Sequence, residues 1–212
     1  MSKIKIRKAE KADSKFLAEI ILLSESTGSE VYTYKSMFPI DEFVLKNKLS
    51  VGLSNSEGEH PLSYQSYLIA EADGQQAGAL SCYIEGKSGD SNHLITGALM
   101  TILDREILFE GLQKVNEHAD LHITKTKDTM QIEHVAIKEE FRGQKILGLL
   151  LEEAEKKALS NKCPFGEIQV WNKNKTAIQA YKNYGYSVKM EKYSSKDSNF
   201  GRILMTKNFH NG

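Results

Sequence analysis

Two strand-to-helix junctions in the second half of the chain constrain its fold more than any other feature. Residues 130–137, MQIEHVAI, alternate apolar and polar side chains as a half-buried strand does, and a helical pattern follows at about 146–159. Residues 167–171 form a second strand pattern, and a helical pattern follows at about 175–184. Successive strand–helix units imply right-handed crossovers, so we expect a sheet that is at least partly parallel.

Further strand and helix patterns flank these junctions. Strands are predicted at residues 4–6, 67–71 and 77–83, and two closing strands at 187–193 and 202–208. Residues 72–76, ADGQQ, are a hairpin signal between two of them. The spacing of apolar residues predicts helices at about 14–23, 39–49 and 102–118. We therefore expect an α/β fold with a mixed central sheet of about seven strands and flanking helices.

The length and composition suit one domain. With 212 residues, 40% of them hydrophobic, the chain can bury a packed core. We expect a single domain over residues 1–212, with an inserted or elaborated region at about 86–129 that carries no recognisable motif. Lys and Arg together number 28, as do Asp and Glu, so no global field attracts nucleic acid or an acidic membrane.

The sequence contains no pattern typical of secretion or of membrane insertion. Cys82 and Cys163 are its only cysteines, and two thiols make no disulfide framework. The first residues alternate charged and apolar side chains, and no run approaches the roughly 18 apolar residues of a membrane span. We expect a cytoplasmic protein.

The loop of the first junction, EFRGQKILG at residues 140–148, has the features of a phosphate-binding site. A helix start offers unpaired N–H groups and the positive end of the helix dipole, and a pyrophosphate suits both. Arg142 adds a bidentate charge, and Gly143 lets the backbone approach a ligand. These residues alone leave open an ordinary strand-to-helix turn with a surface arginine.

The helix of the second junction begins near Asn174 and carries Tyr181 two turns further along. Gly185 suits the C-terminal end of this helix and the turn into the next strand. Asn174 is then either a simple helix cap or an amide that binds a ligand. Tyr181 is either a packing residue beside Ile178 and Tyr184 or a hydroxyl placed for chemistry.

Together the two junctions resemble the acetyl-CoA site of the GCN5-related N-acetyltransferase (GNAT) family. Residues 141–144, FRGQ, resemble the family's loop, in which Arg/Gln-x-x-Gly-x-Gly/Ala follows an aromatic residue. Asn174, Ala177 and Tyr181, with GY at 185–186, resemble the family's pattern Asn-x-x-Ala-x-x-x-Tyr and its closing Gly-Phe/Tyr. Lys145 and Leu147 depart from the pattern, because the family usually has small residues there. A β-carbon at either position crowds the diphosphate, although Lys145 also brings charge to it.

The resemblance implies a GNAT-like, acyl-CoA N-acyltransferase fold and an N-acetyltransferase activity. It implies that an amine of a small-molecule or peptide acceptor, which the sequence does not identify, attacks acetyl-CoA directly in a ternary complex. The residues that it assigns to acetyl-CoA binding are Val135, Ile137, Arg142, Gly143, Gln144, Lys145, Ile146, Leu147, Gly148, Asn174 and Tyr181.

Roles for these residues also follow from the resemblance. Asn174 is expected to hydrogen-bond the pantetheine arm, and the Val135 and Ile137 backbones to pair with it. The Val135 N–H is expected to help hold the oxyanion. Tyr181 is expected to direct its hydroxyl at the thioester sulfur.

Glu133 is the candidate general base, acting through water, and a solvated carboxylate at the strand end is the alternative. Strict alternation along the strand puts Gln131, Glu133 and Val135 on one face and Ile132, His134 and Ala136 on the other. His134 then faces away from Glu133, so we interpret it as structural.

Other functions and partners are also considered. A non-catalytic acyl-CoA-binding or regulatory module on the same fold is favoured by Lys145 and Leu147, and a scaffold that binds no CoA is a third possibility. His118 and His122 have helical i, i+4 spacing without a nearby acidic or cysteine ligand, so we expect no metal site. The acceptor pocket is expected from residues 24–49 and 86–129, and the protein is expected to be a monomer or homodimer.

Overall fold

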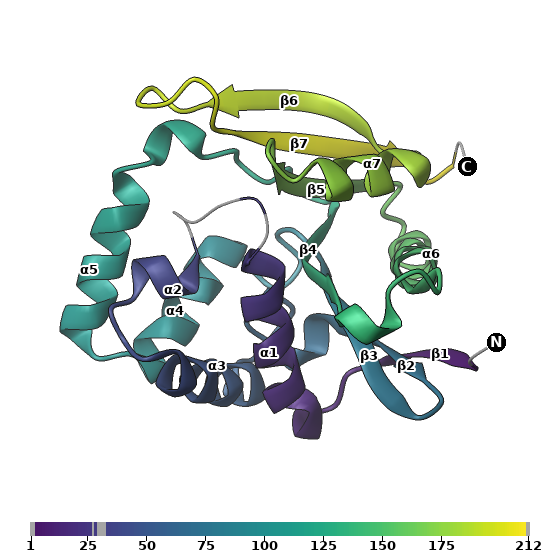
Figure 1. The fold of residues 1–212 in the computed structure, drawn as a ribbon, viewed down its shortest axis with the longest axis horizontal. Coiled ribbons are helices and arrows are strands. Elements are labelled where there is room, and N and C mark those ends of the chain that lie inside the picture. Colours follow the sequence, from purple (N-terminus) through teal and green to yellow (C-terminus); the bar gives the residue numbers. More distant parts are fainter. Residues whose placement is uncertain (1–2, 27, 29–32, 211–212) are drawn as a thin grey trace.

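The computed structural model describes residues 3–26, 28 and 33–210, and its centre is a seven-stranded mixed sheet in the order β1-β2-β3-β4-β5-β7-β6 (Figure 1). Only β4 and β5 pair in parallel, and every other neighbouring pair is antiparallel. The strands are β1 (Ile4–Lys8), β2 (Tyr67–Ala72), β3 (Gln75–Ile84), β4 (Met130–Ile137), β5 (Phe165–Trp171), β6 (Ser187–Tyr193) and β7 (Gly201–Asn208). The predicted mixed α/β sheet is therefore confirmed.

Helices cover both faces of this sheet. They are α1 (Ser14–Glu25), α2 (Tyr34–Met37), α3 (Glu42–Asn55), α4 (Ser91–Ile102), α5 (Arg105–Asn116), α6 (Ile146–Ser160) and α7 (Lys175–Asn183). One apolar core, which we call the α6 core, lies between the sheet and the pair α6 and α7. A second, which we call the α1 core, lies between the sheet and α1, α3 and α4. In Figure 1, α6 accordingly lies on the side of the sheet away from α1 and α3.

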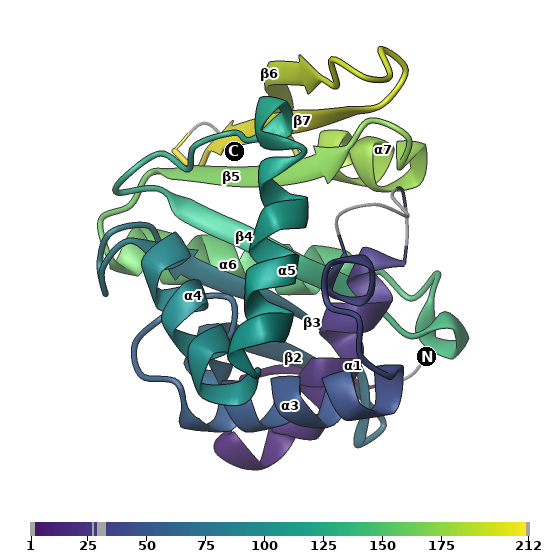
Figure 2. The same cartoon turned by 90° about the vertical axis from the view of Figure 1, so that its left-hand side faces the viewer.

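The helix predicted at residues 102–118 is confirmed as α5 with shorter bounds, and the prediction missed the separate helix α4 that precedes it. Leu103 is buried and extended, and Asp104 is the extended N-cap residue of α5, so the chain breaks between α4 and α5. The missed helix α4 begins after Asp90, whose carboxylate accepts hydrogen bonds from two backbone N–H groups. Figure 2 shows both helices on the α1–α3 side of the sheet. Because α5 ends at Asn116, His118 and His122 lie beyond it and share no helix face.

The predicted hairpin at residues 72–76 is confirmed, because β2 and β3 are joined there by a tight turn. Asp73 and Gly74 occupy this turn with φ values of +49° and +82°. Positive φ at two successive turn positions matches the right-handed twist of the flanking strands, and Asp-Gly adopts that conformation readily.

Strand β4 contains a β-bulge that overturns the predicted alternation. Opposite β3, Glu133 pairs with Ser81 but Ala136 pairs with Ala79, so β4 carries one extra residue between these pairs. His134 lies in the bulge with φ of +47°. As a result Ile132 belongs to the α6 core whereas Ala136 belongs to the α1 core, although strict alternation puts both on one face.

The parallel pairing of β4 with β5 is short, and this positions the functional site. Met130, Gln131 and Ile132 pair with residues 166–168 of β5, and the register extends no further within the described residues. Beyond Ile132 the edge of β4 that faces β5 therefore has no strand partner among the residues that the structure describes. A strand edge without a ladder partner leaves backbone N–H and C=O groups available to a ligand.

Candidate active site

A cleft opens where β4 and β5 part. One cavity of about 560 Å³ is lined by β4, by the loop of the first junction and by α7, and a polar cavity of about 180 Å³ adjoins it. The residues that line both are Ser24, Val135, Asn174, Ala177 and Tyr181. Arg142 and Tyr181, which come from different junctions, line the larger cavity together. The two sequence motifs thus meet at one site.

Most of the residues predicted to bind acetyl-CoA line this cleft. They are Val135, Ile137, Arg142, Gly143, Lys145, Ile146, Leu147, Asn174 and Tyr181. Gln144 and Gly148 do not line it. The predicted base Glu133 lines the polar cavity, next to His134.

The loop of the first junction presents a row of backbone N–H groups. Gly143 and Lys145 adopt left-handed conformations with φ of +79° and +61°, and α6 begins at Ile146. The N–H groups of residues 143–147 donate to no other residue that the structure describes. Free N–H groups at a helix start, with the exposed Arg142 beside them, fit the charge of a diphosphate.

Lys145 and Gly148 differ in what constrains them. Lys145 occupies a backbone conformation that favours glycine, at a cost of roughly 1 kcal/mol, which explains why a small residue is usual there. Gly148 is constrained by packing, because a β-carbon added to it would lie 1.3 Å from the hydroxyl oxygen of Tyr184. Leu147 lines the cleft and packs against the α6 core. The absence of a side chain at Gly148 thus serves the contact between α6 and the end of α7.

Asn174 and Tyr181 both come from α7. Asn174 is the N-cap residue, and its Oδ1 accepts a hydrogen bond from the Ala177 N–H at 3.1 Å. Two turns later Tyr181 is 6% exposed, and its ring makes an edge contact with Tyr186 at 6.3 Å between centroids. Burial raises the pKa of the Tyr181 phenol well above its usual value, so the hydroxyl keeps its proton at neutral pH. A protonated hydroxyl in the cleft is a hydrogen-bond donor.

Glu133 is the acceptor in a half-buried polar cluster. Its Oε1 lies 2.7 Å from Lys125 Nζ and accepts a hydrogen bond from the Tyr83 hydroxyl at 3.0 Å. Burial by itself raises the pKa of Glu133, but Lys125, His134 and Tyr83 outweigh burial and lower it below its usual value. Glu133 is therefore an ionised, paired carboxylate and not a freely solvated one. Lys125 lies in the polar segment 124–129, where sequence reasoning found no functional signal.

His134 lies on the same side of the sheet as Glu133, contrary to the alternation that we expected. Its Nδ1 is 2.9 Å from the Tyr67 hydroxyl, and its ring stacks on the Tyr67 ring and lies 6.2 Å from that of Tyr34. Burial lowers the pKa of His134 to about 4, so the imidazole is neutral at neutral pH. The bulge causes this placement, and no local pattern in the strand sequence indicates a bulge.

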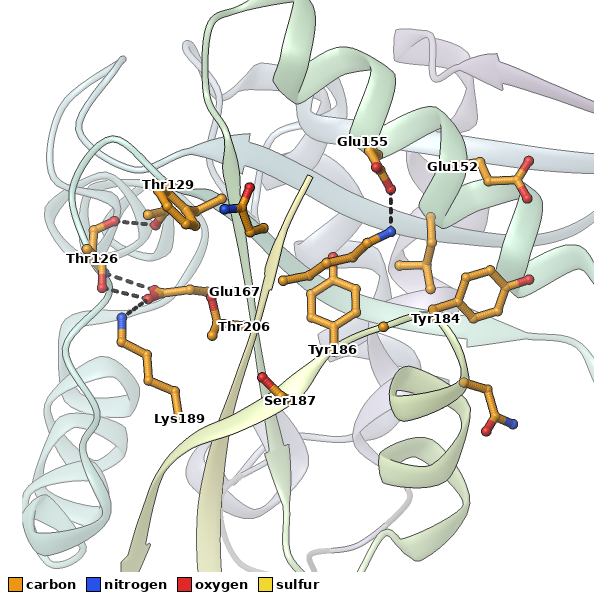
Figure 3. Close-up of a pocket in the computed structure, with 16 residues that line it drawn as sticks. Thr126, Thr129, Glu152, Glu155, Glu167, Tyr184, Tyr186, Ser187, Lys189 and Thr206 are labelled. Carbon is orange, nitrogen blue, oxygen red and sulfur yellow. Dashed lines mark hydrogen bonds and ion pairs between the residues drawn. The ribbon is translucent and has the colours of Figure 1, made fainter. Parts of the chain in front are cut away.

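A larger cavity, of about 920 Å³, lies at the other end of β5 (Figure 3). Figure 3 shows Glu167 and Lys189 pointing toward each other beside Thr126, and they form an ion pair at 2.9 Å. Lys207 is likewise paired, with Glu155 at 2.7 Å. None of the predicted site residues lines this cavity. Its lysines are neutralised and its wall is rich in carboxylates, so it does not suit a polyphosphate cofactor.

Neither a membrane-spanning helix nor a metal-binding cluster is present among the residues that the structure describes. None of their helices has the length and apolar character needed to cross a bilayer. No group of three or more His, Cys, Asp or Glu side chains in the same residues is placed to hold a metal ion.

Similarity to known proteins identifies the family to which the chain belongs. No curated protein is similar to the chain in sequence. In fold the chain is similar to an N-acetyltransferase from Staphylococcus aureus Mu50, at 18% identity and TM-score 0.70 over 96% of this chain and 100% of that one. It is also similar to the PaiA N-acetyltransferase from Thermoplasma acidophilum in complex with coenzyme A, at 19% identity and TM-score 0.58 over 97% and 99%.

A third similar structure is YncA from Salmonella typhimurium with its cofactor acetyl-CoA, at 12% identity and TM-score 0.55 over 97% of this chain and 94% of that one. These low identities show the fold alone. The sequence itself matches the model of the acetyltransferase (GNAT) family over residues 41–186, more than half of the chain. That match spans both junctions and the strands that part between them. The chain therefore belongs to the acetyltransferase (GNAT) family.

Proposed function

We propose that the protein transfers the acetyl group of acetyl-CoA to an amine of a small-molecule or peptide acceptor, by direct attack in a ternary complex. One observation carries the proposal: Arg142 and Tyr181, from two separate junctions, line one cleft between the parting strands β4 and β5. Two proteins of the same fold, PaiA and YncA, hold CoA and acetyl-CoA. Acetyl-CoA is the co-substrate that this family and this cleft suit.

The chain offers distinct groups to each part of acetyl-CoA. The N–H groups of residues 143–147, with Arg142, suit the diphosphate. The unpaired edge of β4 and the Asn174 amide suit the pantetheine arm, which is itself rich in amide groups. The Val135 N–H is the proposed donor to the carbonyl oxygen, on which negative charge develops during attack.

The acceptor amine must lose a proton before it attacks. A primary amine such as that of lysine has a pKa near 10.4, so at neutral pH it is mostly an ammonium ion. Glu133 is the proposed base, acting through water, and the polar cavity that it lines is the proposed seat of the amine. The nitrogen lone pair then forms the new C–N bond, the electrons of the C–S bond leave on sulfur, and the proton that nitrogen still has to lose passes to the thiolate.

Tyr181 is the proposed donor to the departing thiolate. A thiol has a pKa near 8.5, lower than that of any ordinary phenol. Because burial raises the pKa of Tyr181 further, the phenol stabilises the sulfur anion by a hydrogen bond and does not surrender its proton. No step requires an enzyme nucleophile, and the buried Cys82 and Cys163 take no part.

A non-catalytic acyl-CoA-binding module is the competing function, favoured by the side chains of Lys145 and Leu147 in the cleft. Calorimetry with acetyl-CoA, followed by a thiol-release assay on a panel of amines, separates the two functions. Binding with turnover supports the transferase, with Tyr181→Phe as the control that keeps binding. Binding without turnover on any amine supports the module. If acetyl-CoA neither binds nor protects the fold against heating, both functions are rejected.

A further inference from the structure

A second carboxylate, Glu25, lines the polar cavity of the cleft. It is the last residue of α1, and it shares the cavity with Glu133, His134 and Tyr181. Its Oε2 accepts a hydrogen bond from the Tyr34 N–H, at the start of α2, at 2.8 Å. One carboxylate oxygen is thus held by the backbone of a neighbouring helix. Nothing in the sequence around Glu25 signals a function.

The two carboxylates of the cavity differ in their partners. Glu133 shares one oxygen between Lys125 and Tyr83. Glu25 makes no ion pair with any residue in the described part of the chain. Lys35, the cation whose charge acts on it, is itself paired with Glu42. A cationic group that enters the cavity therefore meets one carboxylate that is already paired with a cation and one acidic side chain that has no such partner among the described residues.

Other charged and titratable groups surround Glu25. His134, which also lines the cavity, is neutral at neutral pH, and the buried Tyr34 phenol remains protonated. Arg202 lines the cavity with its guanidinium 5.0 Å from the centre of the Trp171 ring. Burial outweighs the Tyr34 hydrogen bond and the Lys35 charge, and raises the pKa of Glu25 to about 8.

Glu25 and Glu133, the two candidate bases, differ in their affinity for a proton. Proton transfer from an ammonium of pKa 10.4 to a carboxylate of pKa about 8 is unfavourable by a factor of about 250. For Glu133, whose pKa is lowered by Lys125, His134 and Tyr83, the same proton transfer is far more unfavourable. A base whose pKa is near the working pH is the more effective one.

We propose that Glu25 receives the ammonium group of an alkylamine acceptor and is the final acceptor of its proton, while Glu133 remains ionised beside it. This inference rests on the proposed acetyl transfer and refines it, because Glu25 then takes the place of Glu133 as the base of that reaction. The proton passes from nitrogen to the Glu25 carboxylate, through water or directly. The nitrogen lone pair forms the C–N bond, the C–S electrons leave on sulfur, and the second proton that nitrogen loses on becoming an amide passes to the thiolate, giving the CoA thiol. Glu25 returns its proton to solvent after the products leave.

Carboxyl NMR tests the site without a known acceptor. Protein labelled with ¹³C at the glutamate carboxyls is titrated with CoA present, and Glu25→Gln assigns the Glu25 signal. We expect a midpoint near pH 8, lowered by at least about one unit by 1,4-diaminobutane, because a nearby cation favours the carboxylate. The neutral butane-1,4-diol is expected to leave the midpoint unchanged. A midpoint below about 5, or one that the diamine does not move, overturns the inference.

Turnover supplies a second readout, with the amine from the panel that releases CoA fastest. Below pH 8 we expect kcat/KM to rise about tenfold per pH unit, because Glu25 must lose its proton first. Glu25→Gln should abolish this slope and lower turnover at least about 100-fold, whereas Glu25→Asp should keep the slope. Glu19→Gln, at an exposed position on the same helix, is the matched control. An unchanged profile in Glu25→Gln overturns the inference.

The two proposals fail in different ways. If acetyl-CoA does not protect the fold and no amine releases CoA, acetyl transfer is wrong, and the NMR titration still decides whether Glu25 binds a cation. If turnover is found but Glu25→Gln keeps the wild-type pH profile at an unchanged unfolding temperature, acetyl transfer stands and the role of Glu25 is wrong.

Discussion

Replacing Lys125 by methionine tests how Glu133 is held in its ionised form. The substitution keeps most of the side-chain volume but removes the ammonium group that lies 2.7 Å from Glu133 Oε1. Glu133 then faces burial with less compensating charge, so its pKa should rise from its present lowered value. The variant should therefore be less stable than the wild type, and the deficit should depend on pH.

The size of this deficit follows from the burial of the pair. Exposed ion pairs contribute roughly 0–1 kcal/mol, whereas breaking a buried pair costs roughly 3–5 kcal/mol. The side chains of Lys125 and Glu133 are 12% and 24% exposed, between these cases, so we expect a loss of about 2 kcal/mol at pH 7.

The pH dependence has a definite sign. Glu133 has a lower pKa in the folded protein than its unfolded value of 4.5, so the pair stabilises the fold above pH 4.5. That contribution is lost as the pH falls through the folded pKa. The Lys125→Met deficit should therefore be full at pH 7 and should shrink progressively below pH 4.5.

Urea unfolding at a series of pH values measures the deficit. Lys46→Met is the matched control, because Lys46 pairs with Glu19 at 3.3 Å on the surface, where its loss should cost well under about 1 kcal/mol. A Lys125→Met deficit that is the same at every pH would refute the electrostatic argument. It would assign the loss to the hydrogen bonds that Lys125 also donates to Tyr83 and Ser91.

Three further predictions concern the cleft. Tyr181→Phe should lower turnover at least about 100-fold while calorimetry shows nearly unchanged acetyl-CoA binding, and unchanged turnover would remove Tyr181 from the chemistry. If Glu133 is the base, Glu133→Gln should shift the pH–rate profile to higher pH, because the acceptor amine then loses its proton less readily; an unaltered profile would leave Glu25 as the base. Gly148→Ala should destabilise the fold by about 1–3 kcal/mol, since the new methyl group overlaps Tyr184, and thermal unfolding of Gly148→Ala/Tyr184→Ala should recover most of that loss.

Local signals account for the parts of the fold that were predicted correctly. Apolar alternation located the seven strands, and the Asp73-Gly74 pair located the turn between β2 and β3. Asn174 caps α7 and Gly185 follows its C-terminal end with φ of +84°. Each of these features depends on a few neighbouring residues, so a short stretch of sequence contains the relevant information.

The break between α4 and α5 shows where such signals are insufficient. The apolar residues from Ile102 to Val115 fit helical spacing, yet the chain turns at Leu103 because that side chain is buried in the α1 core. The preceding helix begins with polar residues and contains Gly97, so its pattern is weak. The bounds of α4 and α5 depend on packing, of α4 against α3 and of α5 against α2. These partners lie far away in sequence, so a short stretch of sequence does not reveal them.

The sequence by itself determined the order of the strands, most of the helices and the two motifs whose spacing is typical of the GNAT family, because these depend on short-range periodicity and capping. Only the tertiary structure decided what faces the cleft. A single extra residue at His134 turns the following side chains to the other side of the sheet. Glu25 lies far along the chain from Glu133, and the two meet in one cavity only after the chain has folded; Lys125 precedes β4 and reaches Glu133 only because of the fold.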